Sequence, residues 1–229
     1  MIEAVLLEFE GVIADTERAR REALRHTLAE DGVDVTVGEY VERCAAMPIR
    51  TAARNALTLR QRACDETIVD LVTLRAQRRF GLALETGLSL MDGARSFIES
   101  LHGRTRIAIV SRAARTEIDA TLRLAGLDHA FEFIISDDET FASKPSPAPY
   151  VAALDRLARR RVVKPLHVVA LEDGAVGIRS AKSAGIRCAV VGAVPVHLAV
   201  DADALVPSLM GQTAASIDAL TLGARTADR

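Results

Sequence analysis

The chain has 229 residues and a formal net charge of −2, with 49% of its residues hydrophobic and 26% charged. This length accommodates one large domain or a domain that carries an insertion, and the composition is typical of a globular protein and not of a disordered one. The small net charge provides no field that would attract nucleic acid or a membrane surface, so neither kind of partner is expected.

The three cysteines, Cys44, Cys64 and Cys188, are odd in number and far apart in the sequence. No CxxC pair indicates a zinc site or a redox site, and reduced thiols in a cytoplasmic protein are the simplest interpretation. The N-terminus carries acids where a signal peptide needs a basic and then an apolar segment. No apolar run reaches the ~18 residues that are typical of a membrane span. We therefore expect a cytoplasmic protein, and its oligomeric state cannot be predicted.

Several short runs rich in valine and isoleucine have the length of buried strands. They are bounded by turn or polar residues and cover residues 3–8, 106–111, 132–136, 166–171 and 187–192. Helical patterns lie between the later runs, for example at residues 114–125 and 147–160. This alternation predicts an α/β fold, with a mainly parallel sheet that has helices on both faces.

Residues 16–87 break the alternation, because helical patterns follow one another at residues 19–31, 37–46, 50–59 and 66–80. Apolar residues recur there at spacings of three and four, as at Leu24 and Leu28. We expect residues 16–87 to form a small α-helical domain that is inserted into a core made of residues 1–15 and 88–229. The alternation resumes near Asp92, which is expected to cap a helix that runs to Leu101.

Ligands of open parallel sheets bind at the carboxyl ends of the strands. Polar residues at or just past the predicted strand ends are Glu8, Glu10, Ser111, Asp137, Asp138, Glu172 and Asp173. Glu8 and Glu10 stand two residues apart, so the alternation of side chains along a strand would point both in the same direction. Gly11 follows them and permits a sharp turn. This arrangement would present two acids to a substrate or to a metal ion.

Four motifs in chain order resemble those of the haloacid dehalogenase superfamily, in particular its phosphoglycolate phosphatase and β-phosphoglucomutase group. EFEGVIADTE at Glu8–Glu17 is similar to DxDGxxxDT/S, except that two glutamates replace the two aspartates. The strand Ile107–Ser111 ends in a hydroxyl residue, and SKPSP at Ser143–Pro147 is similar to GKPxP. LEDGAVGI at Leu171–Ile178 is similar to the metal-binding EDSxxGI. The resemblance covers nearly the whole chain and implies a Rossmann-like core with an inserted helical cap.

The resemblance also implies roles for individual residues. Glu8 would attack phosphorus as a nucleophile, and Glu10 would act as general acid and base. Lys144 would offset the charge of the nucleophile and of the phosphate. Ser111 would hold the phosphoryl group through its hydroxyl and a free backbone N–H.

The remaining expected site residues concern the metal and the substrate. Glu172 and Asp173 are the implied ligands of Mg²⁺, completed by Glu8, by the position of Glu10 through its backbone carbonyl, and by water. Gly11 and Arg112 are expected beside the phosphate. Arg112 could bind an anionic substrate, pair with Glu10 or point into solvent. The implied partner is a small phosphorylated metabolite.

The two glutamates leave more than one function open. Each side chain is one methylene longer than aspartate, and a misplacement of about 1 Å can cost ~10²-fold in a positioned reaction. Two independent losses would amount to roughly 10⁴-fold, although paired catalytic groups are rarely additive. The first hypothesis is nevertheless a Mg²⁺-dependent phosphatase that acts on a small phosphomonoester.

The alternative hypothesis is a catalytically silent protein of the same fold that binds a phosphorylated metabolite or a protein partner. It is favoured by further departures from the family pattern at Ala46, Ser143 and Gly174. A third hypothesis is hydrolysis by metal-bound water without a covalent intermediate. A mutase is less favoured because Arg50 is out of register with the mutase arginine. A dehalogenase is disfavoured because the metal-binding acids are retained.

Overall fold

The computed structural model describes residues 1–45 and 47–223, so that Ala46 lies outside the described residues. The chain divides into two compact units, which we call the α/β unit, residues 1–14 with 90–229, and the helical unit, residues 15–89. The helical unit begins one residue before, and ends two residues after, the inserted domain expected from the sequence.

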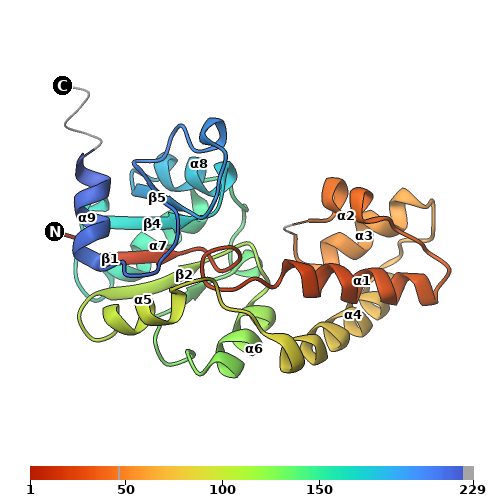
Figure 1. The fold of residues 1–229 in the computed structure, drawn as a ribbon. Helices are drawn as coiled ribbons and strands as arrows, with labels where there is room; N and C mark the ends of the chain where they lie inside the picture. Colours follow the sequence, from red (N-terminus) through yellow and green to blue (C-terminus); the bar gives the residue numbers. More distant parts are fainter. Residues whose placement is uncertain (46, 224–229) are drawn as a thin grey trace. The chain divides into compact units, whose positions relative to one another are not determined.

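The α/β unit is built on one parallel sheet, which within the described residues has six strands in the order β3-β2-β1-β4-β5-β6 (Figure 1). The strands are β1 (Ala4–Leu7), β2 (Arg106–Val110), β3 (Ile134–Ile135), β4 (Val168–Glu172), β5 (Arg187–Val191) and β6 (Ala204–Val206). Every strand pair is parallel. The α/β fold predicted from the sequence is therefore confirmed, whereas β6 was not predicted.

Helices cover both faces of this sheet, which explains why all residues of β1, β4 and β5 are buried. One face packs against α7 (Ala148–Ala158) and α8 (Ala175–Ser183), through a core that includes Leu6 and Ile178. On the other face lie α5 (Ala94–Leu101) and α9 (Ala214–Gly223), as Figure 1 shows. The helix α6 (Arg115–Ala125) connects β2 with β3.

The start of α5 differs from the expectation. Its N-cap is Gly93, with φ of 80° and no side-chain capping bond, and not Asp92. The backbone of another segment lies close to Gly93, so that a Cβ atom there would be 2.2 Å from the nitrogen of Met210. The prediction that Asp92 caps this helix was therefore wrong, because the close backbone approach and the positive φ place glycine at the helix start.

The helical unit contains α1 (Glu17–Glu30), α2 (Val37–Arg43), α3 (Ile49–Leu59) and α4 (Glu66–Gly87). Its own core is formed by apolar side chains from these helices, Leu28 and Val72 among them. At the start of α2, the Thr36 side chain accepts a hydrogen bond from the N–H of Glu39, and the Glu39 carboxylate accepts one from the N–H of Thr36. This reciprocal capping box stabilises the helix start.

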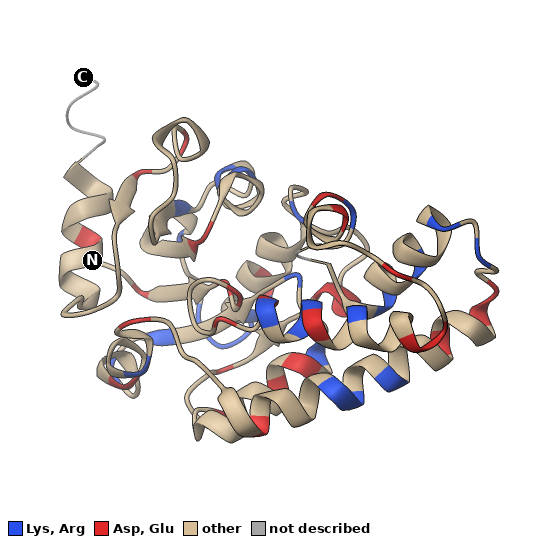
Figure 2. Cartoon of the chain, turned by 45° about the vertical axis from the view of Figure 1, so that its right-hand side comes forward, with Lys and Arg blue, Asp and Glu red and all other residues tan. Residues whose placement is uncertain are grey.

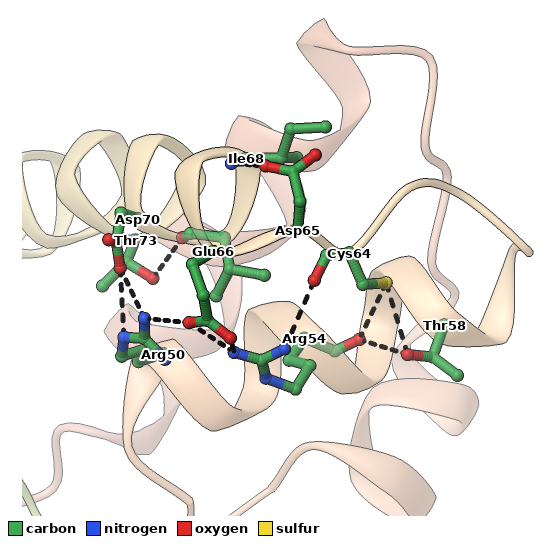
Figure 3. A network of polar contacts seen from close by, with 10 residues as sticks. Arg50, Arg54, Thr58, Cys64, Asp65, Glu66, Ile68, Asp70 and Thr73 are labelled. Carbon is green, nitrogen blue, oxygen red and sulfur yellow. Dashed lines mark hydrogen bonds and ion pairs between the residues drawn. The ribbon is translucent and has the colours of Figure 1, made fainter.

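Charged residues of both signs are interleaved along the helices of the helical unit (Figure 2). Arg50, Arg54, Glu66 and Asp70 form what we call the surface network, which links α3 to α4 (Figure 3). The Arg50 guanidinium lies 2.6 Å from the Glu66 carboxylate and 2.7 Å from that of Asp70. Among the described helices, none combines the length and apolar character needed to cross a membrane.

The chain leaves the α/β unit after Ala14 and returns at Leu90, and these two residues form an antiparallel bridge. Two backbone hydrogen bonds extend the bridge: Met91 N–H donates to the Ile13 carbonyl, and Asp15 N–H donates to the Ser89 carbonyl, each at 3.0 Å. We call this bridge with its two hydrogen bonds the clasp. Entry to the insertion and exit from it are therefore adjacent.

Candidate active site

The topology of the sheet brings three of the expected site residues together. β1 and β4 are adjacent, and the strand order reverses direction between them, which is where ligands of open α/β sheets bind. Leu7 pairs with Ile109 of β2 and with Leu171 of β4, so these strands end at the same level. Glu8, Ser111 and Glu172 consequently lie at one edge of the sheet.

Lys144 is the centre of what we call the buried cluster, formed by Glu8, Ser111, Lys144, Tyr150 and Glu172. Its Nζ lies 2.6 Å from a carboxylate oxygen of Glu8 and 2.6 Å from one of Glu172. It also donates to the Val110 carbonyl at 2.7 Å. The side chain is only 1% exposed. Three acceptors thus match the three N–H donors of a buried ammonium group.

Both carboxylate oxygens of Glu8 accept hydrogen bonds. Oε1 accepts from the Phe9 N–H at 2.8 Å and from the Ser111 hydroxyl, and Oε2 accepts from Lys144. The Ser111 N–H donates to the Ile135 carbonyl at 2.9 Å, because it continues the pairing of β2 with β3. The expectation of a free Ser111 N–H for phosphate was therefore wrong, and only its hydroxyl faces the cluster.

Tyr150 is a member of the buried cluster that the sequence analysis missed. It lies in α7, its hydroxyl donates to Glu172 Oε1, and its ring centroid is 5.1 Å from Lys144 Nζ. An ammonium group at this distance from an aromatic ring is stabilised by a cation–π interaction. The only signal in the sequence was an aromatic residue shortly after Lys144, a pattern that equally fits an ordinary core residue.

Gly177 makes room for the other carboxylate oxygen of Glu172. A Cβ atom on Gly177 would lie 1.8 Å from Glu172 Oε2 and 2.1 Å from its Cδ. Any larger residue would therefore push the carboxylate away from Lys144 and Tyr150 or shift the helix. The close approach of the Glu172 carboxylate thus explains why this position of the fourth motif is a glycine.

Burial raises the pKa of Glu172 to about 7, and the charge of Lys144 opposes this effect without cancelling it. Burial lowers the pKa of Lys144, but the charges of Glu172 and Glu8 outweigh it and leave this pKa raised. Asp173 as a whole residue is exposed to solvent, but protein atoms surround its carboxyl group. This burial, and after it the charge of Glu8, raises the pKa of Asp173 to about 6. Perturbed acids of this kind gather at functional sites.

A cavity of about 120 Å³ opens beside the cluster and is lined by Glu8, Arg112, Lys144, Glu172, Asp173 and residues 174–177. This volume is far below the roughly 300–1,000 Å³ of pockets that enclose drug-sized ligands, so within the α/β unit the cavity suits a small group such as a phosphoryl group. Arg112 lines this cavity, and its charge opposes the rise in the pKa of Asp173.

Glu10 and Gly11 lie differently from Glu8. β1 ends at Leu7, so the alternation of side chains does not extend to the two glutamates, and Glu10 is not among the described residues that line the cavity. Gly11, with φ of 75°, donates its N–H to the Ala14 carbonyl at 3.0 Å. A Cβ atom on Gly11 would lie 2.9 Å from Asp173 Cβ. Gly11 therefore permits both the turn and the close approach of Asp173.

A larger cavity of about 660 Å³ lies within the helical unit, where it is lined by residues of α1 and α4 such as Arg18, His26 and Leu82. These three side chains are exposed at the surface. Of these two cavities, the smaller one adjoins the buried cluster of charged groups, and we assign the candidate active site to it.

The donor set fits a magnesium ion held by few side chains. Among the described residues, no three histidine, cysteine, aspartate or glutamate side chains are grouped so as to hold a metal ion, so the four acids expected as ligands do not form one cluster. Glu172 accepts hydrogen bonds from Lys144 and Tyr150. Glu8 and Asp173 line the same cavity, and Mg²⁺ is commonly bound by one or two carboxylates together with water and substrate phosphate.

Comparison with known proteins identifies the family. The model of the haloacid dehalogenase-like hydrolases matches residues 5–191. Protein CbbY of Cereibacter sphaeroides is 32% identical over 198 residues, which cover 83% of this chain and 84% of the relative. Fructose-1-phosphate phosphatase YqaB of Escherichia coli (strain K12) is 26% identical over 182 residues, 80% of this chain and 92% of the relative.

Solved structures agree with these relatives. The crystal structure of CbbY from Rhodobacter sphaeroides in complex with phosphate superposes with a TM-score of 0.81 at 29% identity, and covers 95% of this chain and 100% of that one. The resemblance noted in the sequence is thereby confirmed. The chain belongs to the haloacid dehalogenase-like hydrolase family.

Proposed function

We propose that this protein is a phosphatase that hydrolyses a small phosphorylated metabolite, of the class of phosphorylated sugars. The family membership supports this proposal, as do relatives that are named as phosphatases of phosphorylated carbohydrates. A mutant of CbbY from Rhodobacter sphaeroides has been solved in complex with xylulose-(1,5)-bisphosphate. The three free thiols support a cytoplasmic location.

The observation that carries the proposal is the ammonium group of Lys144 between Glu8 and Glu172, at the wall of a cavity that Arg112 also lines. Two cationic side chains beside a carboxylate nucleophile suit a transferred phosphoryl group. The carboxylate of Glu172 and the ring of Tyr150 hold the Lys144 ammonium group in place.

In the proposed reaction, a Glu8 oxygen forms a bond to phosphorus while the bond from phosphorus to the ester oxygen breaks. Glu10 donates a proton to the departing oxygen, a role that rests on the family resemblance. Water then attacks the phosphoryl-glutamate at phosphorus, gives its proton to Glu10, and releases phosphate and free Glu8. Lys144 and Arg112 stabilise the phosphoryl oxygens throughout.

Glu8 and Asp173 would hold a magnesium ion, which when bound supplies positive charge to the phosphoryl oxygens. Burial raises the pKa of Asp173. A cation beside its carboxylate would lower this pKa and so favour the ionised form. The helical unit serves as the cap that the family resemblance implies, and selects the substrate.

The test is phosphate release from p-nitrophenyl phosphate and from a panel of sugar phosphates, with Mg²⁺. We expect turnover by the wild type and its loss in Glu8→Gln, whereas Glu99→Gln, an exposed change in α5, retains it. Absence of release by the folded, magnesium-loaded wild type across the whole panel would contradict the proposal.

A second candidate function is binding of a phosphorylated metabolite without turnover. It is favoured by one observation, namely that the Glu8 carboxylate already accepts hydrogen bonds from Phe9, Ser111 and Lys144. A Glu8→Asp/Glu10→Asp double variant separates the two functions. If only this variant hydrolyses phosphoesters, the fold supports catalysis but the two native glutamates prevent it.

A further inference from the structure

The donors around Glu8 form a site for an oxyanion. The Ser111 hydroxyl and the Phe9 N–H converge on Oε1, and the Lys144 ammonium reaches Oε2. Ser111 and Lys144 come from segments far apart in the sequence, and both side chains are buried. A hydroxyl, a backbone N–H and an ammonium group are also the donors that bind phosphate oxygens.

Buried donors require acceptors, because an unsatisfied buried polar group is costly. The Glu8 carboxylate, which is 5% exposed, satisfies these donors. The cavity that Arg112 lines lies directly beside this carboxylate. A phosphoryl group that enters the cavity therefore meets donors that Glu8 already engages.

The length of the side chain makes this contact possible. Glu8 follows β1 and Ser111 follows β2, which are neighbouring strands, and such strands lie about 4.8 Å apart. The Glu8 carboxylate spans this separation to reach the hydroxyl. An aspartate at the same position is one methylene shorter, so its carboxylate would reach less far towards the hydroxyl and compete less with a ligand oxygen.

We propose that Glu8 is an internal competitor for the phosphate site, so that a phosphoryl group binds only after the Glu8 carboxylate leaves the Ser111 hydroxyl. This inference rests on the proposed function, since it concerns the same site. Glu8 would then weaken the binding of every phosphate-bearing ligand. The loss in binding free energy would equal the free energy of the Glu8 hydrogen bonds that have to break.

Calorimetric titration with inorganic phosphate in the presence of Mg²⁺ tests the proposal without requiring turnover. Glu8→Asp is expected to bind phosphate about tenfold or more tightly than the wild type, the effect of removing one charge-assisted hydrogen bond from the competition. Glu99→Asp removes the same methylene from an exposed residue of α5 and is expected to match the wild type. Ser111→Ala in the Glu8→Asp background is expected to abolish the gain.

Equal affinities of the wild type and Glu8→Asp, or no measurable binding by either, would overturn the proposal. If Glu8→Asp does not fold, Glu8→Gln tests the same competition, because a neutral amide holds the Lys144 ammonium less strongly than a carboxylate does. Turnover of p-nitrophenyl phosphate by the same preparations separates this inference from the proposed function. Tighter phosphate binding without wild-type turnover refutes only the function, and turnover without tighter binding refutes only the inference.

Discussion

Glu172 in the α/β unit and Glu66 in the helical unit both accept hydrogen bonds from basic side chains, but they differ in exposure. The Glu172 side chain is 1% exposed and the Glu66 side chain is 67% exposed. Burial raises the pKa of Glu172 to about 7 in spite of Lys144, whereas hydrogen bonds from Arg50 and then Arg54 lower the pKa of Glu66 (Figure 3).

The difference shows that the surroundings decide what an ion pair does. In water the partner's charge and hydrogen bonds stabilise the carboxylate, and the pair adds little to stability. In the buried cluster the carboxylates have lost their hydration, so each depends on Lys144 and on the hydroxyl donors around it. We therefore expect single substitutions to have large effects in the buried cluster and small, salt-sensitive effects in the surface network.

The largest effect is expected for Lys144→Met, which leaves Glu8 and Glu172 without a cation. Breaking a buried pair in this way costs about 3–5 kcal/mol in the free energy of unfolding. The loss measured by urea denaturation should be larger at pH 8 than at pH 5, because Glu172, whose pKa burial raises to about 7, can take up a proton at the lower pH. The exposed lysine change Lys164→Met is the matched control, and a similar loss in both variants would contradict the comparison.

Gly177→Ala is expected to rank second. Its new Cβ atom would meet Glu172 Oε2, 1.8 Å away, so the carboxylate must move from its donors or the helix must shift. Overpacking of this kind costs roughly 1–3 kcal/mol. The control is Gly81→Ala inside α4, where no atom beyond its chain neighbours and the adjoining helix backbone lies within 4 Å of the added Cβ. That change should stabilise by roughly 0.5–1 kcal/mol, because alanine is the better helix former. Equal signs for the two changes would refute this explanation.

Glu39→Gln tests the opposite pKa direction in the helical unit. Hydrogen bonds from Arg60 and then Thr36 lower the pKa of Glu39 from 4.5 to about 2. A folded-state pKa below the unfolded value stabilises the fold above about pH 4.5, and this contribution is lost as the pH falls towards 2. The melting temperature of Glu39→Gln should therefore lie below that of the wild type at pH 7, and the gap should close near pH 2. Glu42→Gln, on the same helix, should show a smaller gap.

The smallest effect is expected for Glu66→Gln in the surface network. The loss in melting temperature should stay below about 2–4 °C, because exposed ion pairs contribute little. It should vanish in 1 M NaCl, where the Debye length is about 3 Å. A larger loss that persists at high salt would show that the network stabilises the helical unit through packing and not through charge.

The sequence predicted most strands and helices because their apolar periodicity reflects burial. It missed β6, which is only three residues long, and it ended α4 at Phe80 although the helix continues to Gly87. The glycine that follows Phe80 argues locally against a helix, but the residues beyond it include Leu84, whose side chain is buried in the core of the helical unit. Burial at Leu84 thus outweighs the low helix propensity of Gly81.

From the motifs we predicted that Glu8, Lys144 and Glu172 belong to one active site, and the structure brings these residues together. The roles of Tyr150 and Gly177 could not be predicted, because each depends on where the Glu172 carboxylate lies in space. The pairing of the Ser111 N–H with Ile135 likewise depends on how far the β2–β3 pairing extends. Sequence patterns locate chemical groups along the chain, whereas hydrogen-bond partners require the folded geometry.

The clasp has a consequence for chain entropy. Because Ala14 and Leu90 of the α/β unit are paired, the ends of the insertion are held together at the point where the chain leaves this unit and returns to it. Each doubling of loop length adds only about 0.6 kcal/mol of closure cost, so the length of what is inserted there matters little to the stability of the sheet. Insertions of very different size can therefore be accepted at this position while the sheet and its buried cluster stay unchanged.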